Sequence, residues 1–236
     1  MIYQILLEAK RNRKKLVAVL IDPEKSETQK LIVFLELVNR SSVDFIFVGG
    51  SIVSKPIDSI VKIIKDNSKK PVILFPGNIM QISDNADAIL LLSLISGRNP
   101  EFLIGQHVQA APYLKKIGVE TIPTGYVLIE SGSTTSVEYM SNTRALPSNK
   151  SELIVATAIA GEMLGLKAIY LEGGSGADEP INKKIIKAVA ESISVPLIVG
   201  GGIDSPEVLH TAFNAGADLV VMGTVFEKNP EKLALF

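Results

Sequence analysis

Eight short apolar runs, rich in valine and isoleucine, recur along the 236-residue chain with helix-like segments between them. Continuous apolar runs of this kind are typical of parallel strands that are buried on both faces. Most are followed by glycine, proline, aspartate or serine and then by a segment long enough for a crossover helix. This rhythm predicts an α/β fold. Its strands are expected at Leu16–Ile21, Asp44–Val48, Pro71–Phe75, Ala88–Leu92, Val119–Ile122, Lys167–Leu171, Pro196–Val199 and Asp218–Met222.

Two architectures use this alternation, a closed (β/α)8 TIM barrel and an open doubly wound sheet. The first strand carries no dinucleotide-binding fingerprint, and glycine-rich turns follow the last strands, which favours the barrel. Barrels of about 250 residues commonly fold as one unit, so we predict a single domain over residues 1–236. Only twelve residues separate Phe75 from Ala88. The third helix is therefore predicted to be missing or vestigial.

Two other parts of the chain depart from the regular rhythm. Residues 124–149 are rich in serine, threonine, glycine and asparagine and form the longest segment that we expect to be irregular. Long loops at the top of a barrel often carry function, although a disordered surface excursion would have the same composition. The chain ends soon after the eighth strand, so the last helix is predicted to be short.

The composition excludes several classes of function. A net charge of −1 supplies no positive field that would hold nucleic acid, so we expect no nucleic-acid partner. The absence of cysteine excludes disulfides, thiolate metal sites and thiol nucleophiles. The first residues show no secretory signal, and the most apolar window, Ala88–Ile95, is shorter than a membrane span of about 20 residues. We expect a cytoplasmic protein.

The turns after the last two strands point to phosphate. The seventh strand ends in GGGIDSPE at 200–207, and the eighth ends in Gly223-Thr224. Glycines allow close backbone approach, and Ser205-Pro206 can begin a helix whose N-terminus attracts anions. Either turn alone is explained equally well as a tight turn. In a barrel the two turns meet where phosphate is often held, so together they predict a phosphate site.

A third glycine-rich turn, YLEGGSG at 170–176, follows the sixth strand. Strand alternation places Tyr170 and Glu172 on the same face, which opens on the pocket at the mouth of a barrel. Glu172 could accept hydrogen bonds from substrate hydroxyls or take a proton. The alternative is a solvated acid beside a flexible loop.

The ends of the first two strands offer oxygen ligands for a metal. Asp22, with Ser51 or water, could hold Mg²⁺, which prefers oxygen ligands and keeps several waters. Asp22 before Pro23 is an equally good helix N-cap. Lys25 could contact phosphate or merely be a solvated residue of a helix.

Other candidate catalytic residues are poorly placed. His107 and His210 fall in predicted helices away from strand ends, which favours structural roles. Lys167 begins the sixth strand, at the wrong rim for a Schiff-base aldolase. We find neither a nucleophile elbow nor a Walker loop.

Several motifs, in order along nearly the whole chain, resemble the geranylgeranylglyceryl phosphate synthase family. They are YLEGGSG at 170–176, the GG pair at 201–202, GT at 223–224, IDPEK at 21–25, VGGS at 48–51, FPGN at 75–78, SGRNPEFLIGQHV at 96–108, PTGYVLIESG at 123–132 and TAIAGEMLGLKAIYLE at 157–172. The resemblance implies a modified barrel that lacks its third helix. It also implies a prenyltransferase that joins the 3-hydroxyl of sn-glycerol 1-phosphate to a polyprenyl diphosphate and releases pyrophosphate.

The resemblance also implies roles for particular residues. Asp22 and Ser51 resemble Mg²⁺ ligands, and Glu172 resembles the residue that binds the glycerol hydroxyls and assists their deprotonation. The glycerol phosphate site would comprise Tyr170, Leu171, Glu172, Gly173, Gly174, Ser175, Gly176, Gly201, Gly202, Gly223 and Thr224. Many members have alanine where this chain has Gly173, a departure that should be mild. The segment at 124–147 is more similar to the group that uses geranylgeranyl chains than to the heptaprenyl group.

Two other functions share these features. A phosphate-binding barrel isomerase or lyase would need an acid/base pair, for which Asp22 and Glu172 are available. A noncatalytic phosphometabolite-binding protein would show no turnover. The resemblance and the apolar helix predicted at Ala156–Leu166 favour a homo-oligomer. A lipid product suggests transient contact with a membrane.

Overall fold

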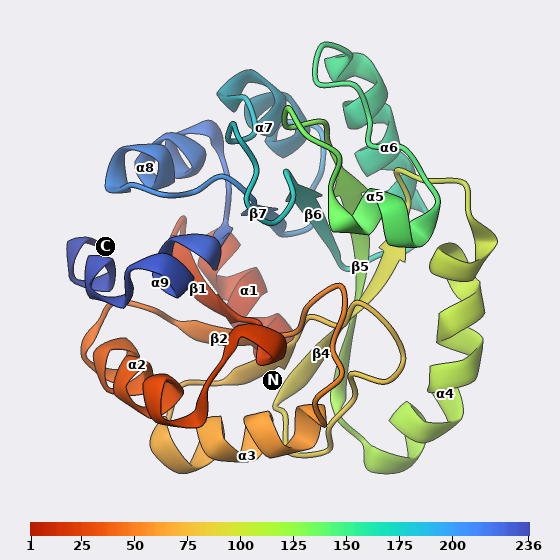
Figure 1. The fold of residues 1–236 in the computed structure, drawn as a ribbon. Helices are drawn as coiled ribbons and strands as arrows, with labels where there is room; N and C mark the ends of the chain where they lie inside the picture. Colours follow the sequence, from red (N-terminus) through yellow and green to blue (C-terminus); the bar gives the residue numbers. More distant parts are fainter.

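The computed structural model describes residues 1–236, and its eight strands form one closed barrel in chain order (Figure 1). Every neighbouring pair is parallel, and the pairing of β1 with β8 closes the sheet. The predicted TIM barrel is confirmed. Its strands are β1 (Leu16–Ile21), β2 (Phe45–Val48), β3 (Val72–Leu74), β4 (Ala88–Leu94), β5 (Glu120–Leu128), β6 (Ala168–Glu172), β7 (Leu197–Gly200) and β8 (Leu219–Met222).

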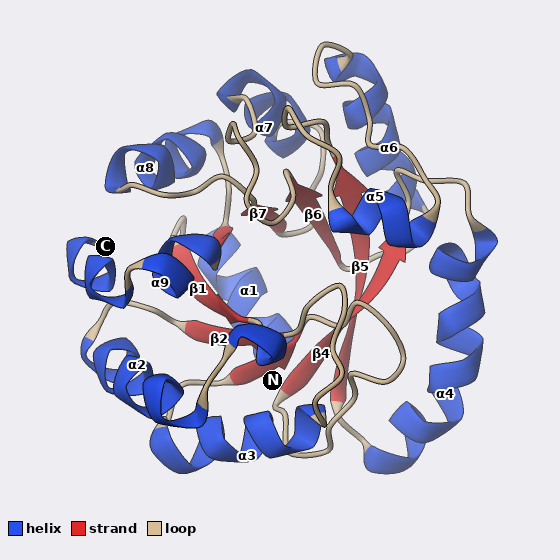
Figure 2. Ribbon diagram, in the orientation of Figure 1, coloured by secondary structure: helices blue, strands red, loops and turns tan.

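Helices surround the barrel (Figure 2). The α-helices are α1 (Ile2–Arg11), α2 (Thr28–Arg40), α3 (Ile57–Asn67), α4 (Gln106–Ile117), α5 (Ser136–Ser141), α6 (Ser151–Met163), α7 (Lys183–Ala190), α8 (Pro206–Ala215) and α9 (Thr224–Lys228). Two 3-10 helices, η1 (Pro23–Lys25) and η3 (Pro230–Leu235), and one π-helix, η2 (Glu101–Gly105), complete the set. The last helix is short, as predicted. None of the helices combines the length and the apolar character needed to cross a membrane.

Helix α1 lies at the end of the barrel where the strands begin, behind the strands in the view of Figure 1. Its buried residues Ile2, Leu6 and Ala9 pack with the inward-facing side chains of the strands. The Glu120 carboxylate at the start of β5 accepts hydrogen bonds from the backbone N–H groups of Ile2 and Tyr3, at 2.5 and 3.0 Å. This closes the amino end of the barrel and leaves the opposite end for a site.

Strand alternation produces two apolar layers. On β6, Ala168 and Tyr170 face the barrel interior, whereas Ile169 and Leu171 pack against the surrounding helices. The other strands follow the same rule, because successive side chains point to opposite faces. Both layers are well buried, which explains why the strands read as continuous apolar runs in the sequence.

No helix lies between β3 and β4, so the predicted loss of the third crossover helix is confirmed. The buried side chain of Gln81 holds the loop that replaces it. Its amide nitrogen donates to the Gly50 carbonyl at 2.7 Å, and its amide oxygen accepts from the N–H groups of Gly50 and Gly77 at 3.2 and 3.3 Å. The loop after β3 is thereby tied to the turn after β2.

The predicted end of the fifth strand at Ile122 was wrong, because β5 continues to Leu128. Proline and glycine are unfavourable inside strands, but pairing with β4 and β6 on both sides keeps Pro123 and Gly125 extended. A Cβ at Gly125 would lie 2.9 Å from Ile95 Cδ1 and Ile169 Cδ1. The glycine therefore allows close packing on the outer face. The segment at 124–149 is also less irregular than expected, since it contains α5 with a Thr135–Glu138 capping box.

Candidate functional site

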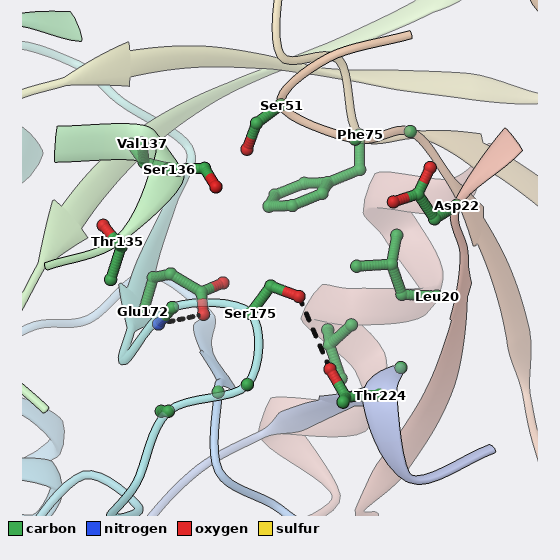
Figure 3. A pocket seen from close by; sticks show the side chains of 18 of the residues that line it. Leu20, Asp22, Ser51, Phe75, Thr135, Ser136, Val137, Glu172, Ser175 and Thr224 are labelled. Carbon is green, nitrogen blue, oxygen red and sulfur yellow. Dashed lines mark hydrogen bonds between the residues drawn. The ribbon is translucent and has the colours of Figure 1, made fainter. Parts of the chain in front are cut away.

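A cavity of about 730 Å³ opens at the carboxyl ends of the strands. Residues from the ends of all eight strands, or from the loops that follow them, line it, as expected for a barrel of this kind. In Figure 3 the Ser51 hydroxyl, the Phe75 ring and the Glu172 carboxylate point into the space between them. The cavity extends from the turns after β6, β7 and β8 to the side of β4 and α4. It is polar at the first end and largely apolar at the second.

Glu172 is the ionisable group at the centre of the site. Its side chain is buried, with 6% of the residue exposed, and its Oε1 accepts a hydrogen bond from the Gly174 N–H at 2.6 Å. Burial raises the pKa of Glu172 to about 7, although hydrogen bonds from Gly174, Tyr170 and Tyr126 favour the carboxylate and oppose this rise. A carboxylate with this pKa can take a proton near neutral pH. Glu172 is therefore able to accept a proton, and the alternative of a solvated acid is wrong because the side chain is buried.

Two tyrosines and a phenylalanine pack beside this carboxylate. The Phe75 and Tyr170 rings stack at 5.1 Å between centroids, and Tyr126 lies 5.4 Å from Tyr170 and 5.9 Å from Phe75. Burial and the charge of Glu172 raise the pKa values of Tyr126 and Tyr170 well above their usual range. Both phenols therefore stay protonated and can donate to the carboxylate.

The three glycine-rich turns meet at one side of the cavity. The backbone N–H groups of Ser175, Gly176, Gly201, Gly202 and Gly223 donate no hydrogen bond within the protein. The hydroxyls of Ser175 and Thr224 approach each other at 3.4 Å, which brings the turns after β6 and β8 together (Figure 3). Unpaired N–H groups beside a helix N-terminus suit an anion such as phosphate. The structure thus brings the predicted phosphate turns together.

Two of the predicted site residues, Leu171 and Gly173, do not line the cavity. Leu171 points outward and is fully buried between the barrel and the helices. The motif 170–176 is contiguous in the chain, but strand alternation turns Leu171 away from its neighbours. Gly173 lies beneath the turn, where its N–H donates to the Gly200 carbonyl at 3.0 Å and its carbonyl accepts from the Ser131 hydroxyl.

Asp22 follows β1 and Ser51 follows β2, and both lie at the mouth of the barrel. A Cβ added at Gly50, which precedes Ser51, would lie 3.0 Å from Asp22 Oδ1. Asp22 Oδ1 also accepts from the Glu24 N–H at 3.0 Å, so the N-cap interpretation is confirmed. Both side chains line the cavity, and Ser51 Oγ takes part in no hydrogen bond.

The oxygen ligands offered by Asp22 and Ser51 fit a magnesium ion whose remaining ligands are water and substrate phosphate. No cluster of three or more histidine, aspartate or glutamate side chains is placed to hold a metal. Mg²⁺ does not need one, since it is usually held by one or two carboxylates together with water and substrate phosphates. One carboxylate and one free hydroxyl on the cavity wall satisfy that requirement.

Lys25 carries the positive charge nearest to Asp22. Its ammonium lies 3.5 Å from Asp22 Oδ2 and 2.8 Å from Glu227 Oε2. Partial burial opposes the charged form, but the hydrogen bond and charge of Glu227 and the charge of Asp22 outweigh it and raise the pKa of Lys25. Lys25 is therefore not simply a solvated residue of a helix.

His107 is closer to the site than we expected. Although it lies in α4, it lines the cavity, and its Nε2 is 3.3 Å from Ser93 Oγ. His210 is exposed on α8, away from the cavity. Lys167 lies at the closed end with its ammonium 5.3 Å from the centre of the Tyr3 ring, so its placement at the wrong rim is confirmed.

Sequence reasoning missed Tyr126, Phe75 and Thr135 as site residues. Tyr126 follows Ile122 and Thr124 in the alternation of β5, so a longer predicted strand would have placed it in the mouth. Phe75 directly follows β3 and continues its inward face. Thr135 begins the capping-box pattern of α5, and a Cβ at Gly174 would lie only 2.4 Å from its Cγ2.

The second end of the cavity is a trough beside β3, β4 and α5. Its apolar lining lies next to the interval between β3 and β4, which lacks a helix. The residues are Phe75, Leu92, Leu94, Phe102, Val137 and Met140. Long aliphatic chains suit such a surface.

Comparison with known proteins gives consistent matches over nearly the full length. The PcrB family model matches residues 9–235. A geranylgeranylglyceryl phosphate synthase of Flavobacterium johnsoniae is 51% identical over 229 residues, which cover 97% of this chain and 94% of the relative. The one from Pyrococcus horikoshii is 42% identical over 224 residues, or 94% and 87% of the two chains.

A solved structure is similar in both fold and sequence. It is the crystal structure of (S)-3-O-geranylgeranylglyceryl phosphate synthase from Thermoplasma acidophilum in complex with its substrate sn-glycerol-1-phosphate. Its TM-score is 0.94 at 30% identity, and the match covers 100% of this chain and 95% of that one.

Proposed function

This chain belongs to the PcrB family, and we propose that it is a geranylgeranylglyceryl phosphate synthase. The enzyme joins the 3-hydroxyl of sn-glycerol 1-phosphate to geranylgeranyl diphosphate through an ether bond and releases pyrophosphate. The resemblance of the sequence motifs to this family is confirmed. One observation carries the assignment: a buried carboxylate with a pKa of about 7 lies beside turns with free N–H groups, in a cavity whose other end is an apolar trough.

The acceptor binds by its phosphate at the glycine-rich turns. The free N–H groups of Gly201, Gly202 and Gly223 donate to the phosphate oxygens, and the Thr224 hydroxyl lies beside them. Anchoring the phosphate orients the glycerol toward Glu172, and such orientation can lower a barrier by roughly 7–11 kcal/mol at best. The Glu172 carboxylate then takes the proton of the 3-hydroxyl as the oxygen attacks the allylic carbon.

The donor places its chain in the apolar trough and its diphosphate near Asp22. The packed rings of Phe75, Tyr126 and Tyr170 line the cavity between the trough and the phosphate site. Aromatic faces attract positive charge, and the allylic carbon becomes positive as the diphosphate departs. The rings also keep water from the reacting carbon, since Tyr126 and Tyr170 are buried.

A magnesium ion is the cofactor that we propose, held by Asp22 and Ser51. Six carboxylates line the cavity against three lysines, so a site that must bind two anionic substrates is itself negative. Bound Mg²⁺ would neutralise the charge that develops on the departing diphosphate.

Asp22→Asn tests the metal site. The variant keeps the N-cap acceptor but loses the ligand charge, so kcat/KM for the prenyl donor is expected to fall about 100-fold or more. Affinity for sn-glycerol 1-phosphate, measured by calorimetry without metal, is expected to stay within a factor of about three, because the phosphate turns are untouched. Removal of Mg²⁺ by EDTA should abolish wild-type turnover. Full activity after metal removal would exclude the cofactor.

The assay that tests the function uses radiolabelled sn-glycerol 1-phosphate, Mg²⁺ and, separately, geranylgeranyl or heptaprenyl diphosphate. We expect label to enter an organic extract with the geranylgeranyl donor. Transfer only with heptaprenyl diphosphate would change the chain-length assignment. No transfer from folded protein with either donor would favour an isomerase, a lyase or a noncatalytic binding protein instead.

Tyr126→Phe tests the hydrogen bonding of the base. The Tyr126 hydroxyl stabilises the Glu172 carboxylate and lowers its pKa. Its removal should raise that pKa, so less base is ionised below neutral pH and kcat falls several-fold there. At alkaline pH the two enzymes should have similar kcat values. A pH–rate profile measures this shift, and an acid limb that stays in place would contradict the hydrogen bond.

The cellular setting is also a proposal. We propose a cytoplasmic homo-oligomer that contacts a membrane transiently to deliver its lipid product. Exposed apolar side chains on and after α6, at Leu153, Met163 and Leu164, support contact between subunits. Exposed Ile52 and Met140 line the cavity at its mouth and support contact with lipid.

A further inference from the structure

The ion pair between Lys25 and Glu227 joins the two halves of the site. Helix η1 begins directly after Asp22, the proposed metal ligand, and Lys25 is its last residue. Glu227 lies in α9, three residues after Thr224. Lys25 Nζ is 2.8 Å from Glu227 Oε2, and both side chains line the cavity. The pair therefore links the turn proposed to hold Mg²⁺ with the turn proposed to hold the acceptor phosphate.

This pair is poorly explained as a structural brace alone. About half of the Lys25 side chain is exposed, at 48%, and exposed ion pairs contribute little to stability. Its second neighbour is another carboxylate, Asp22, at 3.5 Å. A lysine between two carboxylates in a cavity that receives phosphate groups can exchange one partner for a substrate anion at little cost.

We propose that Lys25 binds the diphosphate of the prenyl donor beside Asp22, and that Glu227 holds Lys25 in place until the donor arrives. This rests on the proposed function and adds a residue to its donor site. Lysine is a compact, flexible point charge that suits phosphate oxygens.

The reaction itself explains why a positive charge is useful at this place. The bond from the acceptor oxygen to the allylic carbon forms as the bond from that carbon to the diphosphate oxygen breaks. The electron pair of the broken bond leaves with the diphosphate, and the proton of the acceptor hydroxyl passes to Glu172. Negative charge thus develops on the diphosphate, where the Lys25 ammonium stabilises it.

Paired variants distinguish this role from a structural one. Lys25→Met removes the charge, whereas Glu227→Gln releases the lysine and keeps its charge. Lys30→Met is the matched control, because it also breaks an exposed ion pair, with Glu27 at 3.0 Å, but lies outside the cavity. Steady-state kinetics with each substrate varied, calorimetric binding of inorganic pyrophosphate with Mg²⁺, and thermal unfolding are measured for all.

The proposal predicts opposite changes in the two variants. Lys25→Met should bind pyrophosphate about tenfold more weakly or worse and lose about 100-fold or more in kcat/KM for the donor. Its KM for sn-glycerol 1-phosphate should stay within a factor of about three. Glu227→Gln should bind pyrophosphate more tightly than wild type, because the competing carboxylate is gone. Lys25→Arg should recover part of the affinity.

Three results would overturn the proposal. One is equal loss of activity and Tm in Lys25→Met and Glu227→Gln, which indicates a brace. Another is a rise in KM for sn-glycerol 1-phosphate alone, and the third is unchanged pyrophosphate affinity in Lys25→Met. If wild type transfers no label, the proposed function fails, and the pyrophosphate measurements still decide whether Lys25 binds diphosphate.

Discussion

Replacing Glu172 with glutamine is expected to lower kcat by about 10²–10⁴-fold, the range that general bases contribute. Glutamine has nearly the same shape, and its amide oxygen can still accept the hydrogen bond that Gly174 donates to Oε1. It cannot take a proton from the acceptor hydroxyl. KM for sn-glycerol 1-phosphate should change much less, because the phosphate anchors remain.

The pH dependence of kcat tests whether Glu172 is the base. Burial raises the pKa of Glu172 to about 7, and only the carboxylate is a base. Wild-type kcat should therefore fall as the pH drops below about 7, to roughly one tenth of its plateau one pH unit lower. The residual activity of Glu172→Gln should show no such limb. A wild-type limb that persists in the variant would assign the titration to another group.

The main features of the fold were predictable because they depend on local sequence patterns. Two-sided burial requires continuous apolar runs, and the twelve residues after Phe75 are too few for a crossover helix. The length of β5 was not predictable in this way. Its two neighbouring strands keep Pro123 and Gly125 extended, and such tertiary effects leave little trace in local propensity.

The residues of the candidate site were likewise only partly predictable from local sequence patterns. The glycine-rich turns were found because glycine marks places where the backbone itself is used, and the barrel brings such turns together. Tyr126 was missed with the end of β5, and Leu171 was included because motif positions were counted without strand alternation. The ion pair of Lys25 with Glu227 spans 202 positions of the chain, so no spacing rule would have indicated it.

Gly201 and Gly173 differ sharply in the space available for the side chain of an alanine. Gly201 has φ +87°, and an added Cβ would lie 2.7 Å from the Gly173 nitrogen and 2.8 Å from Glu172 Oε1. At Gly173 the added Cβ would lie at ordinary contact distances, 3.6 Å from Ala177 Cβ and 3.7 Å from the Gly200 carbonyl oxygen. The second result agrees with the expectation that alanine at position 173 has a mild effect.

Gly201→Ala is therefore expected to damage the enzyme, whereas Gly173→Ala serves as its control. A non-glycine residue in this backbone region costs about 1–3 kcal/mol, which should appear as a lower free energy of unfolding in urea. The new methyl group also displaces the Glu172 carboxylate and the Gly173 backbone, which supports the turn after β6. Misplacement of this size can cost about 100-fold, so kcat/KM for sn-glycerol 1-phosphate should fall at least that far.

Gly173→Ala should change the free energy of unfolding by no more than about 0.5 kcal/mol and keep nearly all activity. Urea unfolding establishes the stability of each variant, and kinetics at a temperature where both are folded separate stability from catalysis. Calorimetry with sn-glycerol 1-phosphate then measures the phosphate site directly. Equal affinities in the two variants would mean that the turn after β7 does not bind the acceptor, because only Gly201→Ala crowds it.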